Sequence, residues 1–121
     1  CQTCGYESVF GMGQIYGIRG EYDKAFEKLE LATKVMPNED TAYTNFAYFA
    51  QKSGKELEKG LKYALKATQL KPYKADNWRI LAQVYFKLGQ PEKALEAIER
   101  ALRLKPNSAM YKRLKQQYSG K

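Results

Sequence analysis

The residues best suited to chemistry stand at the start of the sequence, where "CQTCGY" places Cys1 and Cys4 three positions apart. A C-x-x-C-G pattern has the form of one zinc knuckle, and thiols at this spacing also serve redox chemistry. Tetrahedral zinc requires four ligands, whereas the chain offers two cysteines and no histidine. We therefore predict that the chain alone binds no metal and no other cofactor.

Several interpretations of Cys1 and Cys4 remain open. A second knuckle could precede Cys1 if the sequence is part of a longer protein. Cys1 could be lipid-modified, as in mature bacterial lipoproteins, which would anchor the chain to a membrane on the periplasmic side. The two thiols could form a redox pair, or they could be incidental. The location therefore stays open between the cytoplasm and a periplasmic membrane surface.

The absence of histidine also bears on catalysis. Histidine is the commonest general base near neutral pH, and the sequence shows no nucleophile motif or metal constellation in its place. We predict that the chain is not an enzyme and takes no small-molecule substrate.

Charge gives a weaker indication of the partner. Lys and Arg number 21 against 13 Asp and Glu, for a net charge of +8, and residues 102–121 contain no acid. Such an excess attracts acidic partners, nucleic acid or anionic membranes, but it also occurs on ordinary solvated surfaces. Because the aromatic residues fit the helical pattern below, we expect no specific nucleic-acid binding.

The spacing of apolar residues predicts paired helices. From Trp78, apolar residues recur at intervals of three and four until Gly89, and the pattern resumes after Pro91 until Pro106. Proline suits the first turn of a helix, and glycine suits the turn before it. The stretch from Asn77 to Pro106 is therefore predicted to form two antiparallel helices.

The same pattern occurs three times. Glycines at 20, 54 and 89 are 34 and 35 residues apart, and one additional loop residue between Gly54 and Gly60 accounts for the difference. A period of about 34 with W-x2-L-x3-Y, then small residues and a closing proline, resembles the tetratricopeptide repeat (TPR) family. This resemblance implies an all-α, right-handed superhelix of three helix-turn-helix repeats with a C-terminal capping helix.

We expect seven helices in one domain. Its divisions are an N-terminal segment with the cysteines, three repeats, and a capping helix with a tail, at residues 1–5, 6–39, 40–74, 75–108 and 109–121. In the capping helix, Met110, Leu114 and Tyr118 are expected to face the core.

The resemblance also implies a function, since such superhelices bind peptides or partner helices in a concave groove lined by the first helix of each repeat. We predict a protein-protein interaction module, a scaffold or assembly factor, with a protein or peptide partner. The alternative is a repeat portion of a larger protein or lipoprotein whose attached domain or anchor carries the activity. The groove residues implied here are Phe10, Gln14, Thr44, Asn45, Tyr48, Gln51, Arg79, Ile80, Gln83 and Phe86.

The sequence departs from the family members that bind acidic chaperone tails through a clamp of Lys, Asn and Arg. Only Asn45 matches that clamp, whose other positions are occupied by Phe10, Gln14, Asp76 and Ile80. A different ligand is therefore expected. Gly11 and Gly17 are expected to open the groove to a partner's backbone, unless they belong to an edge repeat that frays or packs against an upstream segment.

Overall fold

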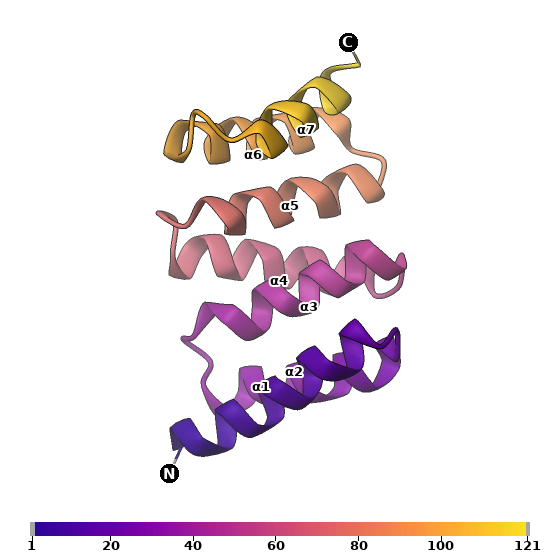
Figure 1. Ribbon diagram of the computed structural model, residues 1–121, viewed down its shortest axis with the longest axis vertical. Helices are drawn as coiled ribbons and strands as arrows, with labels where there is room; N and C mark the ends of the chain where they lie inside the picture. The colour runs from indigo at the N-terminus through magenta and orange to yellow at the C-terminus, as the bar shows by residue number, and fades with distance from the viewer. Residues whose placement is uncertain (1, 121) are drawn as a thin grey trace.

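The computed structural model of the protein describes residues 2–120, which form seven α-helices and no strand within that range. Figure 1 shows them stacked along one axis, with the two ends of the chain at opposite ends of the stack. None of these helices combines the length and apolar character needed to cross a membrane. The helices are α1 (Gln2–Ile18), α2 (Tyr22–Val35), α3 (Asp40–Ser53), α4 (Leu57–Leu70), α5 (Ala75–Lys87), α6 (Pro91–Leu104) and α7 (Ala109–Ser119).

The helices form two layers. In Figure 1, α1, α3, α5 and α7 lie in front, and α2, α4 and α6 lie behind them. The helices α1, α3 and α5 each pack most closely on the helix that follows, whereas α7 packs on α6, and α3 also packs on α5. We call the surface of α1, α3 and α5 the first-helix face, and the surface of α2, α4 and α6 the second-helix face.

Glycines close the first helix of each pair. Gly20, Gly54 and Gly89 have φ angles of 82°, 76° and 78°, a left-handed conformation that residues with a side chain adopt only at an energetic cost. Pro91 occupies the first turn of α6, where its missing N–H has no helical partner. The predicted turns and the predicted seven helices are confirmed.

Small residues allow the paired helices to approach closely. A Cβ added at Gly13 would lie 2.7 Å from Leu29 Cγ, so α1 and α2 touch through the absent side chain. Ala47 and Ala82 occupy the equivalent positions of α3 and α5, and both are fully buried. The pattern of small residues opposite large ones thus positions each pair.

The second pair differs at its turn. Glu56 precedes α4 and has φ 56°, the one left-handed non-glycine residue in the described range. It lies in the loop where the sequence contains one residue more than the other two pairs. The additional residue is therefore accommodated by a strained conformation and leaves the helices in register.

The orientation of the capping helix corrects one expectation. Tyr111 and Tyr118 are buried, Leu114 packs partly against the core, and Met110 remains 46% exposed. The Tyr111 hydroxyl donates a hydrogen bond to Asp76 of α5, which fixes the rotation of α7. The prediction that Met110 faces the core was wrong, because the buried stripe of α7 begins one residue later.

Candidate binding surfaces

The first-helix face brings the predicted residues of α1 and α3 together. Gln14 Nε2 donates to Asn45 Oδ1 across the two helices at 3.3 Å, and Asn45 Nδ2 donates to the Thr41 carbonyl at 2.9 Å. Phe10 is half-buried and stacks on Tyr6, with ring centroids 5.5 Å apart. These side chains form a continuous surface of amides and rings.

Tyr48 is the central ring of this face. It is half-buried, its centroid lies 5.2 Å from that of Phe49, and the Lys52 ammonium lies 5.7 Å from the ring. Gln51 is also half-buried on α3. Tyr48 therefore retains exposed surface while its neighbours hold its orientation.

The predicted residues of α5 are less accessible. Ile80 is 2% exposed and belongs to the core cluster that contains Tyr111 and Tyr118, so the expectation that it contacts a partner was wrong. Phe86 packs on Tyr118, with centroids 4.7 Å apart. The capping helix thus covers α5, and apolar side chains of α5 are buried beneath it.

Arg79 is also largely buried by its neighbours. Its side chain is 17% exposed, Nε lies 3.4 Å from Asp76 Oδ1, and Nη1 donates to Gln83 Oε1 at 3.2 Å. The Nε atom has no hydrogen-bond partner in the described range. Gln83 remains half-buried on the same surface. The guanidinium therefore organises α5 rather than projecting a free cation.

Gly17 differs from its expected role. A Cβ at Gly17 would lie 2.2 Å from Phe49 Cζ, so the space beside this glycine is filled by α3. A Cβ at Gly11 would have no neighbour within 4 Å. Gly17 is therefore a packing residue rather than an opening for a partner, whereas Gly11 does leave open space.

A buried charge network, which the sequence analysis did not identify, lies at the start of α3. Asp40 is 1% exposed and accepts hydrogen bonds from Lys74 Nζ and Asn77 Nδ2, each at 3.0 Å, while Lys71 Nζ lies 3.3 Å away. Burial alone would raise the pKa of the Asp40 carboxyl, but the hydrogen bonds from Asn77, Lys74 and Lys71 outweigh it and lower the pKa to about 2. Thr44 Oγ1 joins the network by donating to Asn77 Oδ1 at 2.9 Å.

Two of the predicted residues line a cavity beside this network. The cavity has a volume of about 470 Å³ and lies between the first turns of α3 and α5, with Thr44 and Asn45 in its wall. The remaining lining residues, which include two acids and two lysines, are Asp40, Thr41, Tyr73, Lys74, Ala75, Asp76, Asn77 and Lys105. In the sequence, the one sign of the Asp40 network was the spacing of Asp40 and Lys74, which are 34 residues apart, about one repeat.

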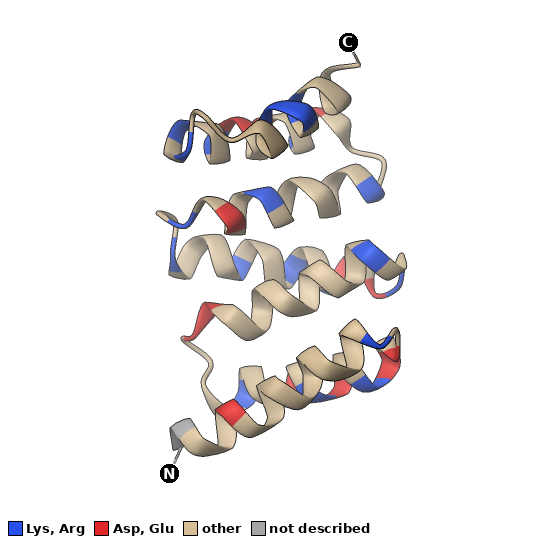
Figure 2. Ribbon diagram, viewed as in Figure 1, with Lys and Arg blue, Asp and Glu red and all other residues tan. Residues whose placement is uncertain are grey.

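Charge is distributed unequally between the two layers. Figure 2 shows that the ribbons of α1 and α3 are mostly free of charged residues, whereas α2, α4 and α6 contain many. Glu7 is the single charged residue of α1, and α3 contains only the buried Asp40 and Lys52 near its end. The first-helix face is therefore mainly neutral where α1 meets α3.

Comparison with known proteins identifies the architecture. Residues 75–108 match the sequence model of the family described as tetratricopeptide repeat. The fold is that of a tetratricopeptide-repeat domain. No curated protein sequence gives a significant match.

Three solved TPR structures resemble the whole chain. The first TPR of Spaghetti (RPAP3), bound to the HSP90 peptide SRMEEVD, is 21% identical with a TM-score of 0.88, covering 95% of this chain and 90% of its own. The Sgt2 TPR domain from Aspergillus fumigatus is 25% identical with a TM-score of 0.87, covering 95% and 77%. The Arabidopsis OM64 TPR domain is 16% identical with a TM-score of 0.90, covering 99% and 98%.

The two cysteines lie near the start of the chain. Cys1 lies outside the described residues, and Cys4 is exposed within α1. Between residues 2 and 120, no group of three or more His, Cys, Asp or Glu side chains is arranged to hold a metal. The open interpretations of Cys1 therefore remain predictions from sequence.

Proposed function

We propose that this TPR domain is a protein-protein interaction module whose first-helix face binds an extended, mainly uncharged peptide segment of a partner. The observation that supports this most strongly is the neutral surface of α1 and α3. Gln14 and Asn45 join the two helices, Tyr48 supplies a half-buried ring, and the Asp40 carboxylate is already paired.

Amides suit the recognition of a peptide backbone. Gln and Asn side chains each carry a donor and an acceptor, as does each peptide unit. Gln14, Asn45, Gln51 and Gln83 are all half-buried, so their polar groups can be reached without exposing the helix backbone. Aromatic rings such as Tyr48 supply apolar contact at a low cost in side-chain entropy, which is why they serve as anchors.

An acidic tail fits this face poorly. The HSP90 peptide in the neighbouring structure contains three carboxylate side chains. At the positions of the family's clamp, this chain has Phe10, Gln14, Asp76 and the buried Ile80. Only Asn45 could bind a carboxylate in the family's manner, and one of its two amide N–H groups already donates to the Thr41 carbonyl.

The proposed role is binding rather than catalysis. The sequence has no histidine to act as a general base. Arg79 and Asp76 form an ion pair on this face, and the Asp40 carboxylate is paired with Lys71 and Lys74. A scaffold needs only shape, amides and apolar contact, all of which this face presents.

Peptide-display selection followed by calorimetry tests the proposal. The peptide that binds most tightly after selection from a random library is titrated against the natural chain, Tyr48→Ala and Gln14→Ala. We expect each variant to weaken binding by five- to a hundredfold, the usual range for interface anchors. Arg103→Ala, on the exposed surface of α6, is the matched control and should bind normally. Unchanged affinity of both first-helix variants would reject the proposal.

A further inference from the structure

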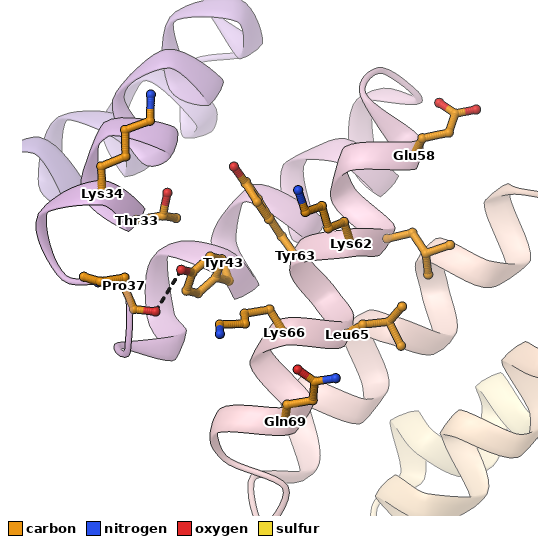
Figure 3. A pocket seen from close by; sticks show the side chains of 11 residues that line it. Thr33, Lys34, Pro37, Tyr43, Glu58, Lys62, Tyr63, Leu65, Lys66 and Gln69 are labelled. Atoms are coloured by element: carbon orange, nitrogen blue, oxygen red, sulfur yellow. Dashed lines mark hydrogen bonds between the residues drawn. The ribbon is translucent and has the colours of Figure 1, made fainter.

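A cleft on the second-helix face has no counterpart in the function proposed above. It lies between α2 and α4, has a volume of about 780 Å³, and is shown in Figure 3. Pro37, Tyr43 and Leu65 contribute apolar and aromatic surface to its wall. The Tyr43 hydroxyl donates to the Pro37 carbonyl at 2.8 Å, which fixes one side of the cleft.

Three lysines surround this cleft without a carboxylate partner. Lys34 comes from α2, and Lys62 and Lys66 come from α4. None of the three forms an ion pair with any residue in the described part of the chain. Glu58 is the one acid among the lining residues, and Figure 3 shows it at the far end of the cleft, pointing away from Lys34 and Lys66.

The next pair of outer helices provides an internal comparison. The equivalent cleft between α4 and α6 has a volume of only about 270 Å³. Glu96 and Arg100 occupy the positions of Lys62 and Lys66, 34 residues later, and the Arg100 guanidinium lies 4.9 Å from the Trp78 ring. That cleft is partly filled by its own residues and carries both signs of charge, whereas the α2–α4 cleft is open and basic.

We propose that the α2–α4 cleft binds an acidic peptide segment of a protein partner, with an apolar side chain of that segment in the cleft and its carboxylates on Lys34, Lys62 and Lys66. Lysine pairs with carboxylates through charge-assisted hydrogen bonds, and the apolar wall rewards an aliphatic group between them. This site lies on the opposite layer from the first-helix face and does not depend on the function proposed for that face.

A nucleic acid fits the same cleft less well. Single strands need exposed aromatic faces for base stacking and a basic groove along the backbone. Tyr43 is 7% exposed, and both Tyr43 and Phe46 hold the Tyr63 ring edge-on at centroid distances of 5.2 and 4.9 Å. The rings here are therefore engaged with one another, and the basic patch covers one cleft rather than a stripe.

Titration of labelled protein with defined probes tests the inference. The probe is an acetylated, amidated peptide of alternating glutamate and leucine. Its binding is monitored by the amide chemical shifts of the full chain. A glutamate–alanine peptide, a lysine–leucine peptide and oligo-deoxythymidine serve as comparison probes. We expect the glutamate–leucine peptide to shift amides of α2 and α4 and to bind at least fivefold more tightly than each comparison probe. Tighter binding of oligo-deoxythymidine, or shifts confined to α1, α3 and α5, would overturn the inference.

A matched pair of variants locates the charges. Lys62→Glu should reduce affinity for the glutamate–leucine peptide at least tenfold, because it places a carboxylate beside the proposed ligand. Arg103→Glu makes the same change in net charge on α6, away from the cleft, and should reduce affinity less than twofold. Both variants replace exposed helical residues, so helical content should remain intact and is checked by circular dichroism. Equal losses in the two variants would show that only net charge matters and would overturn the site.

Discussion

The two faces of this domain use the same scaffold with different chemistry. On the first-helix face, amides and rings from α1 and α3 meet, and the buried Asp40 carboxylate is paired with Lys71 and Lys74. On the second-helix face, Lys62 and Lys66 stand beside an open cleft without a carboxylate partner. The comparison shows that the repeat determines where side chains stand, while the residue types at equivalent positions determine which ligand each face suits.

Among the substitutions that test this comparison, removal of Asp40 should cause the largest change in stability. Asp40→Ala leaves two lysine ammonium groups and the Asn77 amide without their shared acceptor. We expect unfolding free energy to fall by about 3 kcal/mol, near the lower end for breaking a buried ion pair, because the lysines are partly exposed. Urea denaturation measures this fall in unfolding free energy.

The same variant should alter the first-helix face, since Lys74 lines the cavity that contains Thr44 and Asn45. Freed of Asp40, this lysine should give the glutamate–leucine peptide a weak additional site there. Glu27→Ala, an exposed acid of α2, serves as the control and should change stability by less than about 0.5 kcal/mol. An equal loss in both variants would show that the Asp40 network contributes nothing specific.

Acid should remove the stability that the Asp40 carboxylate contributes. The folded-state pKa of Asp40 is about 2, below its ordinary value near 3.8, so its contribution to stability is complete above pH 5 and is lost as pH falls through 4 to 2. A shift of this size corresponds to about 2 kcal/mol. Denaturation of the natural chain and of Asp40→Asn at pH 7, 4 and 2.5 measures this loss of stability. Parallel pH profiles of stability for the two proteins would show that Asp40 is not its source.

Two glycines of α1 should respond in opposite directions. Gly17→Ala places a Cβ against the Phe49 ring, and we expect a loss of about 1–2 kcal/mol after the gain in helix propensity is included. Gly11→Ala meets open space and should stabilise α1 by up to about 1 kcal/mol. Thermal unfolding of both variants tests which glycine belongs to the packed interior, and the reverse order would contradict the structure.

The smallest expected effect lies on the second-helix face. Lys62 lies one helical turn after Glu58 and one turn before Lys66, so Lys62→Glu replaces repulsion from Lys66 with attraction but also replaces attraction to Glu58 with repulsion. Because the two changes offset each other, we expect the unfolding free energy to change by less than about 0.5 kcal/mol while binding of the acidic peptide falls. A variant that loses both stability and binding would indicate that Lys62 supports the fold instead.

The helices could be predicted from the sequence because the residues at which they begin and end act locally. Gly20, Gly54, Gly89 and Pro91 act through the conformation of one or two residues, so the seven helices and their turns follow from spacing alone. The close approach at Gly13 follows the same repeat, because the small residues Ala47 and Ala82 occupy its equivalent positions.

The parts that could not be predicted depend on contacts between repeats. Ile80 is buried in the core, and Tyr111 rather than Met110 faces the core, because α7 packs on α5 through the Tyr111–Asp76 hydrogen bond. Asp40 bonds residues 34 and 37 positions away. Periodicity within one helix contains no information about such partners, and it also does not reveal which lysines remain without a carboxylate.

One titration tests most directly whether the two faces are separate binding surfaces. The peptide obtained by display selection is bound to labelled protein at saturation, and the glutamate–leucine peptide is then added while amide chemical shifts are recorded. The account predicts that the first peptide shifts amides near Gln14, Asn45 and Tyr48, that the second shifts amides near Lys62 and Lys66, and that both remain bound together. Displacement of one peptide by the other, or overlapping sets of shifted amides, would contradict it.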